Sequence, residues 1–247
     1  MAKNKIDCII QARLGSTRLE RKILLKANGI SLIEHLIKRV KKIKNINKII
    51  LSTTENKEDN ELIKFSKKKK INYFRGREDN VLSRVYKTAK KFNSKNILFI
   101  TSDCPIFDID IADQIIEIYK LNDCDFVNNC HYRSYPDGMD IQIFSYNILK
   151  KSFLNAKTDL EKEHVTLYMR KNQKKFKVIN LVASSKLYWP KLGLTLDEYK
   201  DYILIKKLIE YFKRSKNYFF TCKDAIDVIK KYKWQKINYS VKRKGDN

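Results

Sequence analysis

The feature that most constrains the fold of this chain is the alternation of short isoleucine-rich runs with longer segments of helical periodicity. Strand-like runs lie at 6–11, 46–53 and 96–101, and segments with apolar residues three or four positions apart separate them. Strands that alternate with helices in this way form βαβ units, in which the strands are parallel and the helices cover both faces of the sheet. We therefore expect an α/β fold with a mainly parallel, doubly wound, Rossmann-like sheet.

Length and composition favour one large domain. The chain has 247 residues with 6 Gly and 3 Pro, and it contains no Ser/Gly-rich stretch that would serve as a linker. We expect a single domain over residues 1–240 and a frayed, disordered basic tail over 241–247. No apolar run approaches the roughly 20 residues that a membrane-spanning helix needs, so we expect a soluble, cytoplasmic protein without a membrane partner.

The formal net charge of +25 raises the question of a nucleic-acid partner. The lysines recur along the predicted helices, for example at 38–44, 67–70 and 230–233, instead of gathering in one segment. Electrostatic attraction to nucleic acid is independent of its sequence and weakens steeply as the salt concentration rises. Because no zinc-finger, RNA-recognition or basic-zipper pattern accompanies the charge, we expect no specific nucleic-acid partner. A non-catalytic nucleic-acid-binding protein is the alternative to an enzyme.

The segment after the first predicted strand is typical of an anion-binding loop. It places Arg13, Arg18 and Lys22 around a turn that contains Gly15 and Ser16. Ligands of open α/β sheets bind outside the carboxyl ends of the strands, where backbone N–H and guanidinium groups can hold phosphate oxygens. The second Gly and the Lys-Ser/Thr ending of a Walker A loop are absent, which argues against an ordinary P-loop ATPase. A basic surface loop in a lysine-rich chain is the alternative.

Two aspartates are candidate ligands of Mg²⁺. Asp103 directly follows the run at 96–101, so we expect it at the carboxyl edge of the sheet, beside the basic loop. Asp197 ends an apolar run and precedes a helical pattern. Mg²⁺ prefers oxygen ligands and usually keeps water while it bridges to substrate phosphates, so one or two carboxylates suffice. Either aspartate could instead cap the turn or helix that follows it, and for Asp197 this alternative is strong.

Four segments, in matching order, resemble one enzyme family. Residues 13–22 are similar to the Arg-x-Gly-Ser-x-Arg-x-x-x-Lys signature of the cytidylyltransferases that make CMP-linked acidic sugars, and most of all to the SpsF-like, spore-coat-polysaccharide type. Residues 101–105 are similar to the family's Thr-Gly-Asp-Cys-Pro, and residues 74–84 to its Phe-Arg-Gly-x-Glu-Asp-Asp-Val-Leu-x-Arg. Residues 196–201 fall on its Val-Asp-Thr-Pro-Glu-Asp. The resemblance implies the fold of the nucleotide-diphospho-sugar transferases.

The resemblance also implies roles for individual residues. Asp103 and Asp197 are implied to hold Mg²⁺, and Arg13, Lys22 and Asp103 are implied to be catalytic. The residues implied to bind the nucleotide are Gln11, Ala12, Arg13, Gly15, Ser16, Arg18, Lys22, Arg75, Arg84 and Asp103.

The segment that contains Arg75 is a second basic turn that opens a helix. Gly76 permits a close approach of the backbone, and Arg75 can donate to the ring nitrogen and carbonyl acceptors of a base. A charged helix start that favours the helix dipole is the alternative. The resemblance implies that this segment lines the cytosine and phosphate side of the nucleotide, and we therefore expect Arg75 at the base and Arg84 at phosphate or at a neighbouring contact.

Two further segments predict the acceptor side. Residues 135–144 combine a Pro-Asp-Gly turn with alternating residues, which predicts a hairpin-like strand. A helical pattern predicts a helix over about 160–171, and a lone His near the start of such a pattern, such as His164, more often packs or caps than catalyses. Similar Pro-Asp-Gly-x-Asp and Glu-His-Val-Thr segments occur in SpsF-like proteins. The resemblance therefore implies an acceptor pocket that contains Asp140, Glu163 and His164, and Gln142 is a further candidate because it can face a sugar hydroxyl.

Together these features predict a Mg²⁺-dependent nucleotidyltransferase. We expect it to transfer CMP from CTP to an acidic sugar or related acceptor with release of pyrophosphate, in surface polysaccharide or glycoconjugate biosynthesis. Transfer from another nucleotide, such as GTP or a deoxythymidine nucleotide, is one alternative, and the nucleic-acid-binding protein is the other. The presence of both Asp103 and Asp197 favours an enzyme. A homodimer stays open as an alternative to a monomer.

Overall fold

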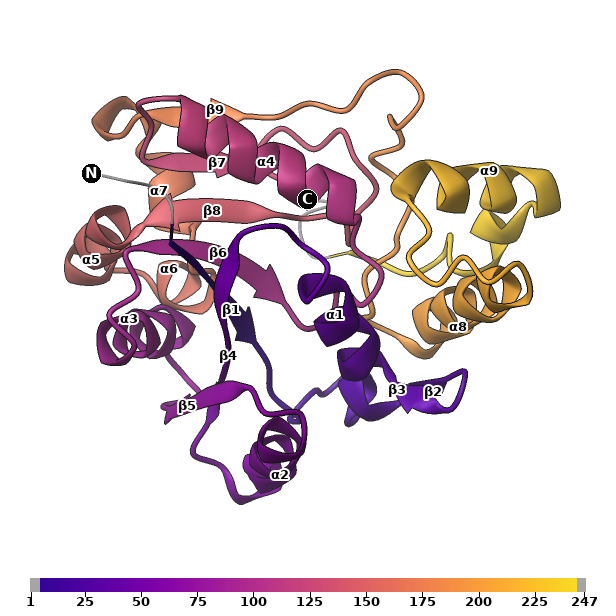
Figure 1. Cartoon of the computed structure of the whole chain (residues 1–247), viewed down its shortest axis with the longest axis horizontal. Helices are drawn as coiled ribbons and strands as arrows, with labels where there is room; N and C mark the ends of the chain where they lie inside the picture. The colour runs from indigo at the N-terminus through magenta and orange to yellow at the C-terminus, as the bar shows by residue number, and fades with distance from the viewer. Residues whose placement is uncertain (1–4, 244–247) are drawn as a thin grey trace.

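The structure is a computed structural model that describes residues 5–243, and a seven-stranded sheet lies at its centre (Figure 1). The order across the sheet is β5-β4-β1-β6-β8-β7-β9. Strand β8 is antiparallel to both of its neighbours, while the other pairs are parallel. The predicted mainly parallel sheet is therefore confirmed. The strands are β1 (Ile6–Gln11), β4 (Ile46–Thr54), β5 (Asn72–Gly76), β6 (Asn96–Thr101), β7 (Phe126–Asn128), β8 (Gln142–Ser145) and β9 (Val178–Asn180).

Helices cover both faces of this sheet, as the alternation of strands and helices predicts. Side chains of a strand alternate between its two faces, and in β1 Cys8 and Ile10 join one buried cluster while Ile9 joins the other. The larger cluster includes residues of α1, α4, α8 and α9, and the smaller one includes residues of α3, α5 and α7. The helices are α1 (Leu32–Val40), α2 (Asn60–Lys68), α3 (Val81–Lys91), α4 (Ile109–Leu121), α5 (Tyr146–Asn155), α6 (Asp159–Glu163), α7 (Leu167–Lys171), α8 (Tyr199–Arg214) and α9 (Cys222–Tyr232).

Backbone hydrogen bonds bring the residues that follow β1 and β6 together, beside β4, at one edge of the sheet. The N–H of Ala12, just after β1, donates to the carbonyl of Ser52 in β4 at 3.0 Å. The N–H of Ser102, just after β6, donates to the carbonyl of Gln11 at 3.0 Å. This edge therefore carries both the basic loop and Asp103. A small antiparallel pair, β2 (Lys26–Ala27) and β3 (Ile30–Ser31), follows the basic loop.

The C-terminal segment differs from the expected tail. Val241 is buried, and the Arg243 side chain forms ion pairs with Asp137 and Asp201, so residues 241–243 pack against the rest of the protein. Residues 244–247 of the expected tail lie outside the described residues. The expectation of one domain over 1–240 stays a prediction.

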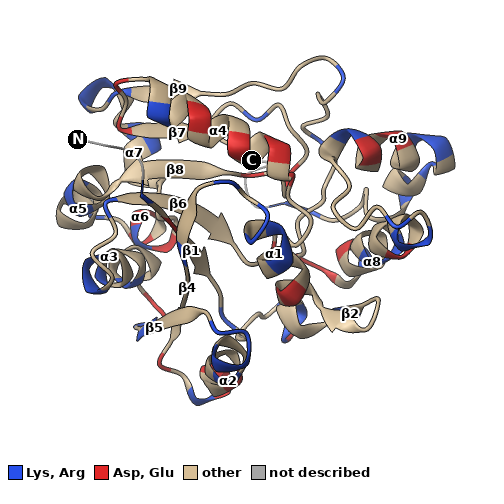
Figure 2. Cartoon of the chain, in the orientation of Figure 1, with Lys and Arg blue, Asp and Glu red and all other residues tan. Residues whose placement is uncertain are grey.

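The basic residues are distributed over many elements of the protein. Figure 2 shows Lys and Arg on many helices, including α3, α5, α8 and α9, and not on one element alone. Among residues 5–243 there is no helix that is both long and apolar enough to cross a membrane.

Candidate active site

Two aspartates from distant parts of the sequence converge on one lysine at this edge of the sheet. Lys22 Nζ lies 3.2 Å from Asp197 Oδ1 and 3.6 Å from Asp103 Oδ2. It also donates to the carbonyl of Leu196 at 2.5 Å. The two aspartate segments are joined directly, because the N–H of Leu196 donates to the carbonyl of Asp103 at 2.8 Å. The structure thus brings together the two residues that the sequence predicts as metal ligands.

Asp197 also pairs with a second cation from the basic loop. Arg18 Nη2 donates to Asp197 Oδ1 at 2.7 Å. Helix α8 begins at Tyr199 with Glu198 as its N-cap, and Asp201 supplies the acid of the capping box. Asp197 is therefore not the N-cap that its position in the sequence suggests. Its carboxylate forms ion pairs with Arg18 and Lys22 instead.

The rest of the basic loop faces acidic side chains. Arg13 Nη1 lies 3.2 Å from Glu78 Oε1, and both side chains are about 40% exposed. The Glu58 carboxylate lies close to Gly15, because a Cβ added to this glycine would fall 2.7 Å from Glu58 Oε1. The Ser16 hydroxyl accepts from the N–H of Leu19 at 3.5 Å, which closes the turn.

An open cavity of about 450 Å³ lies at the ends of β4 and β5, next to this loop. Glu78 belongs both to its lining and to the pair with Arg13. All of its lining residues are of polar or charged types, namely Glu55, Asn56, Arg77, Glu78 and Asp79.

Arg75 lies apart from the cluster around Lys22. Its guanidinium donates to the carbonyls of Thr54 and Asn56, each at 2.9 Å, and to Asn60 Oδ1 at 2.8 Å. These three bonds fix the connection between β4 and α2. A role of Arg75 at the base remains a prediction.

Arg84 is buried beneath the turn that carries Glu78. Burial, followed by the positive charge of Arg13, lowers the pKa of Arg84 to about 10. Its Nη1 donates to the carbonyl of Arg77 at 2.5 Å. Within residues 5–243, its Nε and Nη2 have no hydrogen-bond partner. A buried donor without a partner is costly, so this guanidinium is suited to an additional acceptor or to holding the turn.

On the expected acceptor side, two carboxylates flank one guanidinium. Arg133 Nη1 lies 2.9 Å from Asp137 Oδ1, and Arg133 Nη2 lies 3.3 Å from Asp140 Oδ2. Burial, and then the charge of Asp140, raises the pKa of Asp137 to about 6. Burial also raises the pKa of Asp140, against the lowering effect of Arg133. Burial disfavours the charged form of Arg133, but the two carboxylates outweigh it and raise its pKa above the ordinary value.

The other predicted acceptor residues are placed differently. Gln142 is a buried residue of β8 whose Oε1 accepts from the Thr166 hydroxyl at 2.5 Å. Glu163 is the last residue of α6 and His164 is its C-cap, and α6 contacts α3. The expected continuous helix over 160–171 is thus divided into α6 and α7. Asp140 is the predicted acceptor residue that lies among the charged groups described above.

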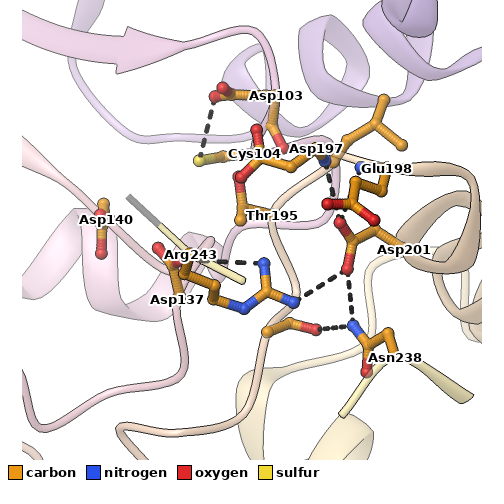
Figure 3. Close-up of polar contacts among 12 residues, drawn as sticks. Asp103, Cys104, Asp137, Asp140, Thr195, Asp197, Glu198, Asp201, Asn238 and Arg243 are labelled. Carbon is orange, nitrogen blue, oxygen red and sulfur yellow. Dashed lines mark hydrogen bonds and ion pairs between the residues drawn. The ribbon is translucent and has the colours of Figure 1, made fainter. Parts of the chain in front are cut away.

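Sequence reasoning gave no role to two residues of the C-terminal segment that reach this region (Figure 3). Arg243 Nη2 and Asn238 Nδ2 donate to Asp201 Oδ1 at 2.8 and 2.7 Å. The other carboxylate oxygen of Asp201 accepts from the N–H groups of Asp197 and Glu198 at 3.1 and 2.9 Å. Arg243 gives no local signal, because it stands in a basic segment of a lysine-rich chain.

The donor set fits a hard divalent cation. Asp103 and Asp197 present carboxylate oxygens to the same Lys22 ammonium. Within residues 5–243, no group of three or more His, Cys, Asp or Glu side chains could hold a metal by itself. Two carboxylates nevertheless suffice for Mg²⁺ when water and substrate phosphates complete its shell. The residues therefore suit a cation that arrives with a nucleotide.

Comparison with known proteins identifies the family of the chain. Residues 8–243 match the family described as Cytidylyltransferase. The spore coat polysaccharide biosynthesis protein SpsF of Bacillus subtilis is 31% identical over 212 residues, which cover 84% of this chain and 87% of SpsF. A cytidylyltransferase structure from Leptospira borgpetersenii covers 97% of this chain and 98% of its own, with a TM-score of 0.88 and 31% identity.

A more distant solved structure shares the fold. CMP:2-keto-3-deoxy-manno-octonic acid synthetase complexed with CTP has a TM-score of 0.63 and 13% identity, over 84% of this chain and 99% of that chain. The architecture is thus that of the nucleotide-diphospho-sugar transferases, as expected. With the family match over residues 8–243, these findings establish that the chain belongs to the cytidylyltransferase family and is a nucleotidyltransferase.

Proposed function

We propose that this protein transfers CMP from CTP to a hydroxyl group of an acidic sugar, with Mg²⁺ and with release of pyrophosphate, in the biosynthesis of a surface polysaccharide or glycoconjugate. The observation that carries the proposal is the convergence of Asp103 and Asp197 on Lys22 at the carboxyl edge of the sheet. The family supports CTP as the nucleotide, and the name of SpsF supports a polysaccharide pathway.

The basic loop binds the triphosphate in this proposal. Arg18 and Lys22 pair with Asp197 in the structure, so both already lie beside the proposed metal ligands. Arg13 is partly exposed and close to Glu78, where it can turn toward phosphate. Charge-assisted hydrogen bonds from such cations are short and strong, and they favour the charge that develops on the departing pyrophosphate. Mg²⁺ held by Asp103 and Asp197 supplies further neutralisation of the phosphate oxygens.

The reaction itself is an in-line displacement. The acceptor hydroxyl oxygen forms a bond to the α-phosphorus and its proton passes to solvent, while the bond from that phosphorus to the bridging oxygen of the β-phosphate breaks and pyrophosphate leaves. Alignment and charge stabilisation supply most of the catalysis in such a transfer. The protein's part is to hold the α-phosphorus between the acceptor side and Lys22.

Arg133 supports an acidic acceptor on electrostatic grounds. Asp137 and Asp140 would repel a carboxylate, and a cation must outweigh them. Arg133 lies between the two carboxylates, and its side chain is 40% exposed. Its planar guanidinium can therefore release one of these aspartates and bind the carboxylate of the acceptor instead. Assignment of the acceptor side to these three residues is part of the proposal, as is a homodimer.

A substrate panel tests the proposal. Pyrophosphate release is measured with Mg²⁺ and each of CTP, GTP, UTP, ATP and dTTP, against 3-deoxy-manno-octulosonate, N-acetylneuraminate and neutral glucose. We expect release with CTP and an acidic sugar, and a larger rise of the melting temperature with CTP than with the other nucleotides, because a ligand that binds the folded state stabilises it. Equal shifts and equal turnover for all five nucleotides would remove the claim of cytosine specificity, and turnover with glucose alone would remove the acidic acceptor.

A further inference from the structure

We infer that Arg243 is a positioning residue that holds the loop carrying Asp197 and the loop carrying Asp137 in their working geometry. The inference deepens the proposed function, because it rests on Asp197 as a ligand of Mg²⁺. In Figure 3 the Arg243 side chain extends between Asp137 and Asp201, and dashed lines mark its contacts with both. Asp197 and Asp137 belong to the proposed metal side and the proposed acceptor side, so one side chain contacts both halves of the site.

The contact with Asp201 is the stronger of the two. Arg243 Nη2 lies 2.8 Å from Asp201 Oδ1, and Arg243 Nη1 lies 3.9 Å from Asp137 Oδ2. The Asp201 side chain is 0% exposed and that of Arg243 is 10% exposed. A buried carboxylate that loses its cation is strongly disfavoured. Arg243 thus supplies the cationic partner of the buried Asp201 side chain.

Asp201 connects Arg243 to the loop that carries Asp197, because it accepts hydrogen bonds from the backbone of that loop. Its second oxygen accepts from the N–H groups of Asp197 and Glu198. Asp197 is therefore held by its own main chain, while its carboxylate remains directed at Lys22 and Arg18. Loss of the cation at Asp201 should allow the Asp197 backbone to shift, and a metal ligand that is misplaced binds more weakly.

Gly193 shows that the path of Arg243 is built into the fold. A Cβ added to Gly193 would fall 1.6 Å from Arg243 Nη2, so the guanidinium lies directly against this glycine. Gly193 also forms a backbone bridge with Asp137 and accepts from Asn238 Nδ2 at 2.9 Å. Since Gly193 is not among the positive-φ residues, alanine fits its backbone conformation and conflicts only with neighbouring atoms. The far end of the Arg243 side chain is what must move.

The test separates positioning from charge and from overall stability. The variants are Arg243→Ala, Arg243→Lys and Gly193→Ala, with Lys242→Ala as the matched control, because Lys242 is the exposed neighbour in the same segment. The readouts are the affinity for Mn²⁺ in the presence of CTP, followed by electron paramagnetic resonance, the KM for 3-deoxy-manno-octulosonate, and the melting temperature.

For Arg243→Ala we expect about tenfold weaker Mn²⁺ binding and about a tenfold higher KM for the acceptor, which is the scale of one charge-assisted hydrogen bond. At saturating Mg²⁺ and acceptor, kcat should recover to within about threefold of the parent. Arg243→Lys should restore part of the loss, because a lysine keeps the charge but lacks the planar fork. Lys242→Ala should match the parent protein in every readout.

Gly193→Ala supplies the independent check. It should reproduce the Arg243→Ala values, and the double variant should be no worse than either single variant, because both changes disrupt the same contact. Additive losses in the double variant, or parental Mn²⁺ affinity and acceptor KM in Arg243→Ala whatever its melting temperature, would overturn the inference. The Mn²⁺ measurement does not need turnover. Mn²⁺ and CTP binding by the parent protein with no acidic sugar consumed would therefore refute the proposed function alone.

Discussion

Lys22 Nζ lies 3.2 Å from Asp197 Oδ1, although the two residues are 175 positions apart in the chain. The pair joins the loop after the first strand to the segment before α8. In the proposed function the two residues need this proximity, because Lys22 would bind an oxygen of the triphosphate while Asp197 would hold the Mg²⁺ that neutralises the same triphosphate.

Replacement of either proposed metal ligand should abolish most of the activity. Asp103→Asn and Asp197→Asn keep side-chain size but remove a charged oxygen ligand, so pyrophosphate release should fall by about a hundredfold or more while the melting temperature stays close to that of the parent. Asp227→Asn is the control, because Asp227 pairs with Lys223 on the exposed face of α9. Near-parental turnover in both ligand variants would contradict the assignment.

Arg13 should matter far more than surface lysines. Arg13→Ala should lower kcat/KM by about 30-fold, which corresponds to about 2 kcal/mol of transition-state stabilisation. The exposed lysines Lys67 and Lys68 on α2 provide the comparison. Their joint replacement by alanine should leave kcat/KM unchanged, because exposed charges are screened over roughly 8 to 10 Å. Steady-state kinetics at physiological salt measure both effects on kcat/KM. A larger loss of kcat/KM in the double lysine variant than in Arg13→Ala would show that overall positive charge, and not the basic loop, supports catalysis.

Arg84 should be more important for binding CTP than for stability. Arg84→Met removes a buried charge whose Nε and Nη2 have no hydrogen-bond partner within residues 5–243. Apolar replacements of buried charges are often close to neutral, so the free energy of unfolding should stay within about 1 kcal/mol of the parent. The KM for CTP should rise about tenfold. The variant lacks a hydrogen-bond donor that would either bind a phosphate of CTP or hold the turn before α3. A loss of stability above about 3 kcal/mol with an unchanged KM would show a purely structural role.

The raised pKa of Asp137 predicts a pH dependence of stability. Its pKa of about 6 lies above the ordinary value of roughly 3.9, so the folded state binds the proton more tightly than the unfolded state. The resulting stabilisation is fully present below about pH 4 and is lost as the pH rises through about 6. Asp137→Asn should therefore raise the free energy of unfolding by on the order of 1 kcal/mol at pH 8 and have little effect at pH 4. Urea denaturation at both pH values measures this, and a difference that does not depend on pH would contradict it.

The sequence could predict the convergence of the basic loop with Asp103 for a simple reason. Parallel strands end at the same edge of a sheet, so the residues that follow β1 and β6 must be neighbours. The position of Asp197 was harder to predict, because its place before α8 also suits an N-cap. The structure shows that Glu198 is the N-cap, with Asp201 completing the capping box, which leaves the Asp197 carboxylate for the cations.

Other parts of the site depend on contacts that no local pattern reveals. Arg243 reaches Asp137 from a segment whose composition predicts a frayed tail. Arg75 donates its three hydrogen bonds to the β4–α2 connection, and these bonds depend on the conformation of that loop. The predicted helix over 160–171 is divided, because a capping box at Thr158 starts a five-residue helix and His164 then adopts an extended conformation. In each case a tertiary contact or a local cap determines the result, and periodicity alone gives no information about it.

The most direct test of the proposed reaction is ³¹P nuclear magnetic resonance of a mixture of the protein, CTP, Mg²⁺ and 3-deoxy-manno-octulosonate or N-acetylneuraminate. The account predicts the appearance of a CMP-sugar phosphodiester resonance together with an equal amount of pyrophosphate, and the absence of both when Mg²⁺ is chelated or Asp197→Asn is used. Pyrophosphate that forms without a phosphodiester product, or a phosphodiester product that forms equally well in Asp197→Asn, would contradict it.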